Sequence, residues 1–357
     1  MIKKGRGVKK FACLGLLLLL AVSLAATGCG GGAATDKEKS GAKDQAAAKA
    51  DKPAVKIDMK LCGADPGAGG VWDLMGGGVA QTIKKGMPGS SVTLVPGGGV
   101  SDVNIVTKSA EPMMGLTHSV IAVAAENGAD PFKQKITNVK ALFSMYVTKQ
   151  QIAVTEDFPL NSFKEIVEKK YPLKAAVDEP GSTQHLANQR MFELLGASYK
   201  DVESWGGKIY LKGQEEGSHL MGDGVVNCFP ILGPAPQGPI QEVSATHKIR
   251  FLKMDQDLID RMCSKYGYSK EVVPKSAYPF LKEDYQSFGS RVIIIANDVM
   301  TNDQAYAIVK AMCENIEYLR GVHANLRELT PQLMASGTGI KLHPGAEKYY
   351  KEVGAIK

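Results

Sequence analysis

The sequence lacks the short motifs that mark the common catalytic, metal-binding and nucleotide-binding sites. It contains no Gly-x-Ser-x-Gly, no His-Glu-x-x-His and no Cys-x-x-Cys, and its Cys and His residues show no metal-ligand spacing. No Lys-Ser or Lys-Thr follows a glycine-rich turn at the spacing of a phosphate-binding loop. These absences argue against a hydrolase, a metalloenzyme and a nucleotide-dependent enzyme. We therefore expect no catalytic residue, no metal and no cofactor.

Cysteine is also scarce, with six in 357 residues. Beyond Cys29, the remaining four lie in apolar strand or helix patterns and are not paired at any redox or metal spacing. Buried thiols are the expectation, and a disulfide is the alternative. The four residues are Cys62, Cys228, Cys263 and Cys313.

No apolar run is as long as a membrane-spanning helix, which needs about 20 residues. The longest, residues 11–26, follows a cluster of Lys and Arg and leads through Ala25-Ala26-Thr27-Gly28 to Cys29. This order resembles a bacterial lipoprotein signal peptide. It predicts that residues 1–29 are a signal, that Cys29 carries the lipid, and that the protein is held outside the cytoplasm on the lipid bilayer. A single membrane-spanning helix is the alternative.

The excess of positive charge is small once this signal is set aside. The formal net charge of +6 falls to about +1 without the five Lys and Arg residues of residues 1–10. Nothing in the charge pattern therefore points to nucleic acid. Residues 30–54 are rich in Gly, Ala, Lys, Asp and Ser and have almost no large apolar side chain, which predicts a disordered tether.

The roughly 300 remaining residues are enough for two α/β lobes. Apolar strands are expected at residues 55–61, 91–95, 112–116 and 138–146, with helices between them, and this order predicts a mostly parallel sheet. Further strands at 151–155 and 291–296 are expected to cross between the lobes, and two long helices, at about residues 302–318 and at residues 344–352, are expected to close the chain. The predicted fold is therefore α/β and bilobal, with residues 55–152 and 291–357 in lobe I and residues 153–290 in lobe II.

Three glycine-rich turns follow predicted strands. Glycine lets a turn bring its backbone N–H groups close to a ligand, and a helix start adds unpaired N–H groups and a partial positive charge. A single such turn is usually only a tight turn, but three suggest a shared cleft that receives an anion. The turns contain Gly69 and Gly70, then Gly97 and Gly98, and then Gly181, Ser182 and Thr183 after Pro180.

The order of these motifs resembles the TAXI-type solute-binding subunits of TRAP transporters, from about residue 60 to the C-terminus. The most specific match is the closing string from Leu342-His343-Pro344-Gly345 to Tyr350. The other motifs on which the resemblance rests are Gly69-Gly70-Val71-Trp72, Gly97-Gly98, Pro180-Gly181-Ser182, and Pro236 followed by Ile240-Gln241-Glu242.

The resemblance implies a type II periplasmic-binding-protein fold that captures a small organic anion and delivers it to a TRAP membrane permease. The implied ligands are C4 or C5 dicarboxylates, 2-oxoacids or glutamate-like amino acids. The sequence departs from the family pattern at Trp72, where Tyr is usual, and at His118-Ser119-Val120, where Gln-Ser-Asp is frequent. The missing carboxylate removes a partner for a ligand ammonium, which favours a plain carboxylate or oxoacid over an amino acid.

Further ligand contacts are expected where strands end. Thr117, His118 and Ser119 end a predicted strand, and Arg291 is the one arginine that begins a strand expected at the hinge. Each has a structural alternative: a loop histidine for His118, helix capping for Ser182, an interlobe salt bridge for Arg291 and core packing for Trp72. His343 is expected to fix a helix start. The predicted ligand-binding set is Gly69, Gly70, Trp72, Gly97, Gly98, Thr117, His118, Ser119, Gly181, Ser182, Thr183, Pro236 and Arg291.

The sequence thus predicts a membrane-tethered, monomeric and non-enzymatic solute receptor. Two alternatives have the same fold: a ligand sensor for a signalling kinase, and a receptor that feeds an ABC permease. A lipoprotein enzyme is the third alternative, and the missing catalytic motifs argue against it.

Overall fold

The computed structural model describes residues 55–64 and 70–357, which belong to one compact unit that begins at Lys52. The predicted signal peptide with its lipidated Cys29, the predicted tether and the predicted ligand contact at Gly69 lie outside these residues. Within the described part of the chain, no helix is long and apolar enough to cross a membrane.

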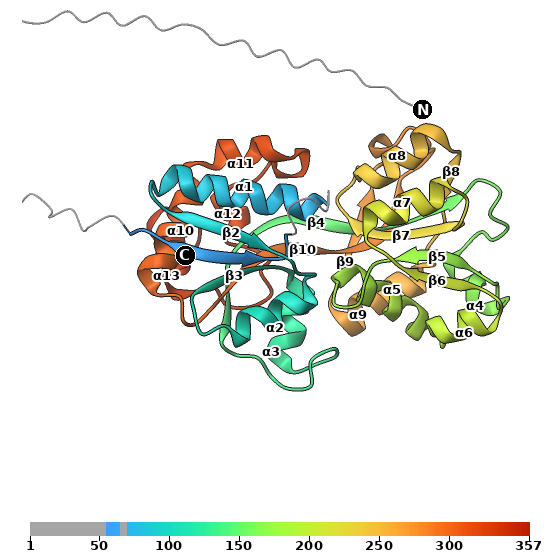
Figure 1. The fold of residues 1–357 in the computed structure, drawn as a ribbon, viewed down its shortest axis with the longest axis horizontal. Coiled ribbons are helices and arrows are strands. Elements are labelled where there is room, and N and C mark those ends of the chain that lie inside the picture. Colours follow the sequence, from blue (N-terminus) through green and yellow to red (C-terminus); the bar gives the residue numbers. More distant parts are fainter. Residues whose placement is uncertain (1–54, 65–69) are drawn as a thin grey trace, which may run out of the picture. The chain divides into compact units, whose positions relative to one another are not determined.

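A mixed sheet of ten strands is the centre of the fold (Figure 1). Its main path runs β2-β1-β3-β10-β4-β7-β5-β6, while β8 pairs with β4 and β9 pairs with β10. The strands are β1 (Asp58–Cys62), β2 (Ser91–Val95), β3 (Met113–His118), β4 (Val139–Thr155), β5 (Lys174–Val177), β6 (Lys208–Leu211), β7 (Cys228–Gly233), β8 (Ile249–Phe251), β9 (Ser269–Val273) and β10 (Tyr285–Asn297).

Helices cover both faces of the sheet at each end of this path (Figure 1). The α-helices are α1 (Val71–Gly86), α2 (Val100–Lys108), α3 (Ser119–Asn127), α4 (Phe163–Glu168), α5 (Thr183–Leu194), α6 (Tyr199–Ser204), α7 (Gln214–Gly222), α8 (Gly238–Thr246), α9 (Gln256–Tyr266), α10 (Asn302–Glu314), α11 (Ile316–Val322), α12 (Pro331–Met334) and α13 (Pro344–Glu352). Two short 3-10 helices, Lys275–Ala277 and Ala324–Leu326, complete the pattern.

Two long strands connect the ends of the sheet. β1, β2 and β3 pair in parallel, as do β5, β6 and β7, and we call these groups the β1–β3 half and the β5–β7 half. Between them, β10 runs antiparallel to β3 and β4, and β4 runs antiparallel to β7. The α/β class and the crossing strands are therefore as predicted. The predicted lobe boundaries at 152/153 and 290/291 fall inside β4 and β10.

The structure corrects several predicted elements. The separate strands predicted at 138–146 and 151–155 are one strand, β4, in which Thr148 and Gln150 between them are buried. β10 begins at Tyr285 rather than Arg291, and β9 was not predicted. The single helix predicted at 302–318 is interrupted at Asn315 and forms α10 and α11.

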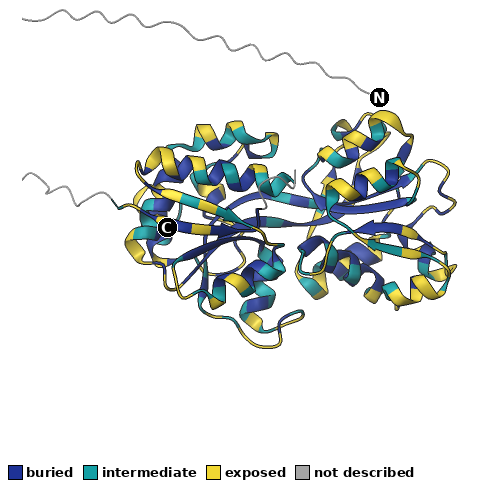
Figure 2. Cartoon of the chain, viewed as in Figure 1, coloured by how far each residue is buried: buried dark blue, intermediate teal, exposed yellow. Residues whose placement is uncertain are grey.

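Apolar side chains form two cores. One core packs α1, α10 and α13 against one face of the β1–β3 half; Met75, Val79 and Ile83 form the buried stripe of α1, as their spacing predicts. The other core packs α2 and α3 against the opposite face and continues through the β5–β7 half. Burial therefore concentrates in the strands, and exposure in the outer helix faces (Figure 2).

The prediction for His343 is confirmed, and the prediction of buried thiols is confirmed for three of the four cysteines. His343 is the N-cap of α13, where its Nδ1 accepts a hydrogen bond from the backbone N–H of Gly345 at 3.3 Å. All four cysteines in the described residues are free thiols. Three of them are buried, whereas Cys263 is partly exposed.

Candidate functional site

A cavity of about 500 Å³ lies at the carboxyl ends of the parallel strands. Both halves of the sheet contribute to its wall: the start of α1, the β2–α2 loop, β4, the β5–α5 turn, the start of α7 and the end of β7. This is the position that a parallel α/β topology favours for a ligand. Eight of the predicted residues come together here: Gly70, Trp72, Gly97, Gly98, His118, Gly181, Ser182 and Thr183.

The β2–α2 loop and the β5–α5 turn bind each other across this cavity. The N–H groups of Val100 and Ser101 both donate to the carbonyl of Gly181 at 3.1 Å, and the N–H of Thr183 donates to the carbonyl of Gly98 at 2.9 Å. We call these contacts between residues 98–101 and 181–183 the glycine latch. Because the helix-start N–H groups of α2 and α5 are used in this way, they are not the free anion receptor that the sequence suggested.

The Asp102 carboxylate holds the β2–α2 side of the glycine latch in place. It accepts hydrogen bonds from the N–H of Gly98 at 3.2 Å and of Gly99 at 2.8 Å, so these donors are also occupied. A Cβ on Gly97 would lie 1.7 Å from Oδ1 of Asp102, which makes glycine necessary there. Asp102 is fully buried, and desolvation raises its pKa to about 7 against the lowering effect of these hydrogen bonds. Thr117 also serves the loop, because its hydroxyl donates to the carbonyl of Gly99 at 2.8 Å.

Trp72 and His118 form an aromatic wall of the cavity. Their rings stack at 5.4 Å between centroids and 30° between planes. The Thr148 hydroxyl donates to the carbonyl of Ser290 at 2.9 Å and so accepts from Nε2–H of His118 at 3.1 Å. Nδ1 of His118 is then an acceptor, and it has no hydrogen-bond partner among the described residues. Burial lowers the pKa of His118 to about 3, so the ring is neutral at physiological pH.

Three glutamines form a chain of hydrogen bonds in the wall, which we call the glutamine relay. The backbone N–H of Leu232 donates to Oε1 of Gln184 at 3.3 Å, and Nε2 of Gln214 donates to the same oxygen at 2.7 Å. Nε2 of Gln237 then donates to Oε1 of Gln214 at 2.6 Å. Nε2 of Gln184 and Oε1 of Gln237 are left buried without a partner in the described structure.

Two buried hydroxyls add to the free polar groups of the wall. The Thr183 hydroxyl has no hydrogen-bond partner within residues 55–64 and 70–357. The Tyr146 hydroxyl lies against the indole of Trp72 and finds no partner of good geometry in the same residues, and burial raises its pKa. Buried polar groups in folded proteins are normally hydrogen-bonded. Five free groups around one cavity therefore indicate a site for a polar ligand.

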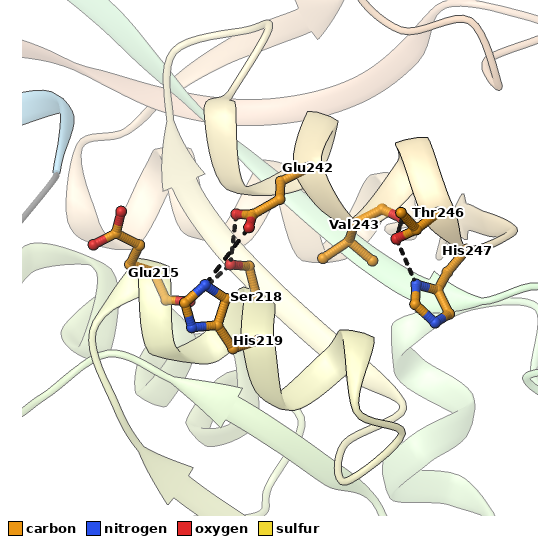
Figure 3. A network of polar contacts seen from close by, with 7 residues as sticks. All are labelled: Glu215, Ser218, His219, Glu242, Val243, Thr246 and His247. Atoms are coloured by element: carbon orange, nitrogen blue, oxygen red, sulfur yellow. Dashed lines mark hydrogen bonds and ion pairs between the residues drawn. The ribbon is translucent and has the colours of Figure 1, made fainter.

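The charge of the cavity wall is negative. Five acidic residues line it, whereas no lysine or arginine of the described chain does. Glu215 and Glu216 lie at the start of α7. This helix contacts α8, where Glu242 lies 3.2 Å from the Ser218 hydroxyl and 3.5 Å from Nε2 of His219 (Figure 3). The five acidic residues are Asp73, Asp178, Glu179, Glu215 and Glu216.

The structure places four predicted residues away from the cavity wall: Thr117, as described above, and Ser119, Pro236 and Arg291. Ser119 Oγ lies 3.2 Å from Ser290 Oγ. The Arg291 guanidinium donates to the carbonyl of Met145 at 3.4 Å, and burial lowers its pKa. Ser182 lines the cavity but its Oγ caps α5, accepting from the N–H of His185 at 2.9 Å.

Tyr146, Thr148 and the three glutamines were not predicted as site residues. Tyr146 is the last residue of a predicted strand, Thr148 falls between two predicted strands, and glutamine carries no motif of its own. The one available signal was position: Gln184 directly follows Thr183 in a turn that was already a candidate.

Known proteins resemble this chain in sequence and in fold. The model of the NMT1-like family matches residues 64–354. MatC from Rhodopseudomonas palustris, solved with bound malate, has a TM-score of 0.53 at 12% identity, covering 85% of this chain and 98% of that one. The periplasmic binding protein BugD has a TM-score of 0.47 at 17% identity, and the match covers 85% of this chain and 99% of BugD. A TctC solute-binding protein from Polaromonas has a TM-score of 0.45 at 14% identity, and the match covers 85% of this chain and 100% of that protein. The likeness to MatC confirms the predicted type II periplasmic-binding-protein fold.

Proposed function

The chain belongs to the NMT1-like family, and from this premise we propose that it is a non-enzymatic, extracytoplasmic solute receptor. It captures a small polar organic solute in the cavity between the two halves of the sheet and delivers it to a membrane permease. The observation that carries the proposal is the set of five buried polar groups without partners in the described structure, all of which belong to residues that line this one cavity.

The transport system is proposed from the sequence. The ordered motifs from Gly70 to Tyr350 resemble TAXI-type subunits, so we propose a TRAP-type permease as the membrane partner. The lipoprotein-like signal supports a chain that is anchored to the bilayer through Cys29 and acts as a monomer in the periplasm or on the outer face of the cell membrane.

A carboxylate on the solute fits the donors of the cavity. Tyr146 and Thr183 offer hydroxyls, and Gln184 offers an amide N–H, all buried. Hydrogen bonds from such preorganised neutral donors replace the water around a carboxylate without a cation in the wall. The solute classes proposed from the sequence, a C4 or C5 dicarboxylate, a 2-oxoacid or a glutamate-like amino acid, all carry this group.

Native mass spectrometry of the purified protein, followed by thermal unfolding with a panel of these acids, tests the proposal. Ligands that bind only the folded state raise its stability, by about 2.7 kcal/mol at a hundredfold excess over Kd. We expect a co-purified solute or an upward shift of Tm with at least one acid. A Gln184→Met variant should lose most of that shift, while Gln241→Met, an exposed change on α8, should keep it. No solute and no shift with any acid would contradict a receptor role.

A further inference from the structure

We propose that the glutamine relay makes the cavity select solutes that carry a hydrogen-bond donor beside their acceptor, such as an ammonium beside a carboxylate, over plain dicarboxylates. This inference rests on the proposed receptor function and names the solute class of the same site. It reverses the preference for a plain carboxylate that the sequence suggested from the missing carboxylate at Val120.

The relay has a direction because one end is fixed by the backbone. β5 pairs with β7 only at Ala175 and Cys228, so the N–H of Leu232, further along β7, is free to donate to a side chain. It holds Oε1 of Gln184, and that oxygen also accepts from Gln214. Turning the Gln184 amide around would place its NH₂ against the N–H of Leu232, whose direction the backbone fixes, and would leave both groups buried without a partner.

The same direction passes to the other end of the relay. The NH₂ of Gln214 donates to Gln184, so Gln214 offers only Oε1, an acceptor, to Gln237. The Gln237 side chain therefore turns its NH₂ towards Gln214 and donates to that oxygen. Oε1 of Gln237 is then held as a buried acceptor beside Gly233, where a Cβ would lie 2.6 Å from it. The wall therefore shows a fixed donor at Gln184 and a fixed acceptor at Gln237.

A plain dicarboxylate satisfies only half of this wall. Its oxygens are acceptors, so they pair with Gln184, Thr183 or Tyr146 but leave Oε1 of Gln237 without a donor. An ammonium or amide NH₂ on the same carbon skeleton supplies that donor. The acidic residues of the wall act in the same direction: Glu216 is paired with Lys212 at 2.8 Å, and the others favour a positive group and oppose a second negative one.

Titration calorimetry with L-glutamate and glutarate tests the inference, because the two share a five-carbon skeleton and differ in the ammonium group. A hydrogen bond to a charged group, lost so that a buried acceptor stays unpaired, corresponds to about 10- to 100-fold in affinity. We therefore expect L-glutamate to bind at least about tenfold more tightly than glutarate. L-Glutamine and 2-oxoglutarate form a second pair, with the same order expected.

Two variants and a control locate the effect. Gln237→Met removes the acceptor while filling its space, and Gln214→Met cuts the relay at a partly exposed position. Each should lower the preference for L-glutamate towards one, chiefly by weakening L-glutamate. Gln241→Met makes the same change on α8 at an exposed position and should leave the preference unaltered. Circular dichroism establishes that each variant is folded, and the wild-type comparison does not depend on the variants.

The outcomes separate the inference from the function on which it rests. Equal or tighter binding of glutarate by the wild-type protein, or an unchanged preference in both folded relay variants, overturns the inference and leaves the receptor function standing. If none of the four acids binds, native mass spectrometry of the co-purified solute decides: a solute that lacks a donor group overturns the inference, and one that carries both groups supports it. No retained solute at all overturns the function as well.

Discussion

The substitution Asp102→Asn tests the buried support of the glycine latch. Asp102 is the third residue of α2, fully buried, and its two oxygens accept from the N–H groups of Gly98 and Gly99. The variant keeps the size of the side chain and one acceptor oxygen, removes the charge, and turns an NH₂ towards one of the two N–H donors. The cost of that contact does not depend on pH, so the pH dependence of the stability difference isolates the cost of burying a carboxylate under the loop.

The magnitude follows from the pKa. Burial raises the pKa of Asp102 from 3.8 to about 7, roughly three units, which corresponds to ~4 kcal/mol. Between these pH values the folded state holds the proton and the unfolded state does not, so the free energy of unfolding falls as pH rises. The asparagine side chain of the variant does not titrate. The stability of the wild-type protein relative to the variant should therefore fall by about 3 kcal/mol between pH 5 and pH 8.

Urea unfolding of both proteins at pH 5 and pH 8 measures this difference, because groups that titrate alike in both proteins cancel. Asp201→Asn is the matched control: Asp201 is also the third residue of its helix and accepts from the N–H of Ser198 at 2.8 Å, but it is exposed. This control measures the same substitution at an exposed helix start, where the side chain is not buried. An Asp102→Asn effect that is equal at both pH values would refute the reasoning about desolvation.

Three further substitutions test other parts of the structure. Gly98→Val places a Cβ 2.9 Å from the carbonyl of Gly181, and overpacking of this kind costs about 1–3 kcal/mol; solute binding should weaken about tenfold, and unchanged affinity would argue against the latch. Thr183→Val removes a buried hydroxyl and should weaken solute binding about five- to tenfold in calorimetry without lowering Tm; a lower Tm would indicate a structural role instead. Arg190→Met removes a buried guanidinium that donates to the carbonyl of Asp130 at 2.6 Å and lies over a tyrosine ring; unfolding in urea should require about 2–3 kcal/mol less, and a change below about 1 kcal/mol would contradict this.

The sequence predicts the elements whose pattern is local. β2 and α13 begin and end where they were expected, because an alternating strand beside glycine and a proline-led helix start need no distant information. β4 was divided into two because residues 148–150 are polar. In the structure the side chains of Thr148, Gln150 and Gln151 are buried, and their hydrogen-bond partners lie on β10, on α5 and directly after β7. That environment exists only after the chain has folded.

The same limit applies to the site. The glycine turns and the Trp72–His118 pair could be selected because strand ends and glycines are visible in the sequence. The relay could not, because Gln184, Gln214 and Gln237 are far apart in the chain, and each owes its role to the orientation that its neighbour imposes. The acidic wall was missed for a related reason, since its members come from three separate elements.

Closure and recognition use different groups in this fold. The glycine turns use their backbone N–H and C=O groups to hydrogen-bond each other. A contact made of backbone groups alone cannot distinguish one small solute from another. Side chains on β3, β4, α5 and the segment before α8 supply the free groups of the cavity and must therefore distinguish between solutes, while Gln214 on α7 orients two of them. A change in the latch should therefore alter the affinity for all solutes by a similar factor, whereas a change in the relay should alter the ratio between them. Measuring both acids with Gly98→Val and with Gln237→Met separates these two effects. If Gly98→Val changed the ratio of the two affinities, or if Gln237→Met lowered both affinities equally, closure and recognition would not be separate.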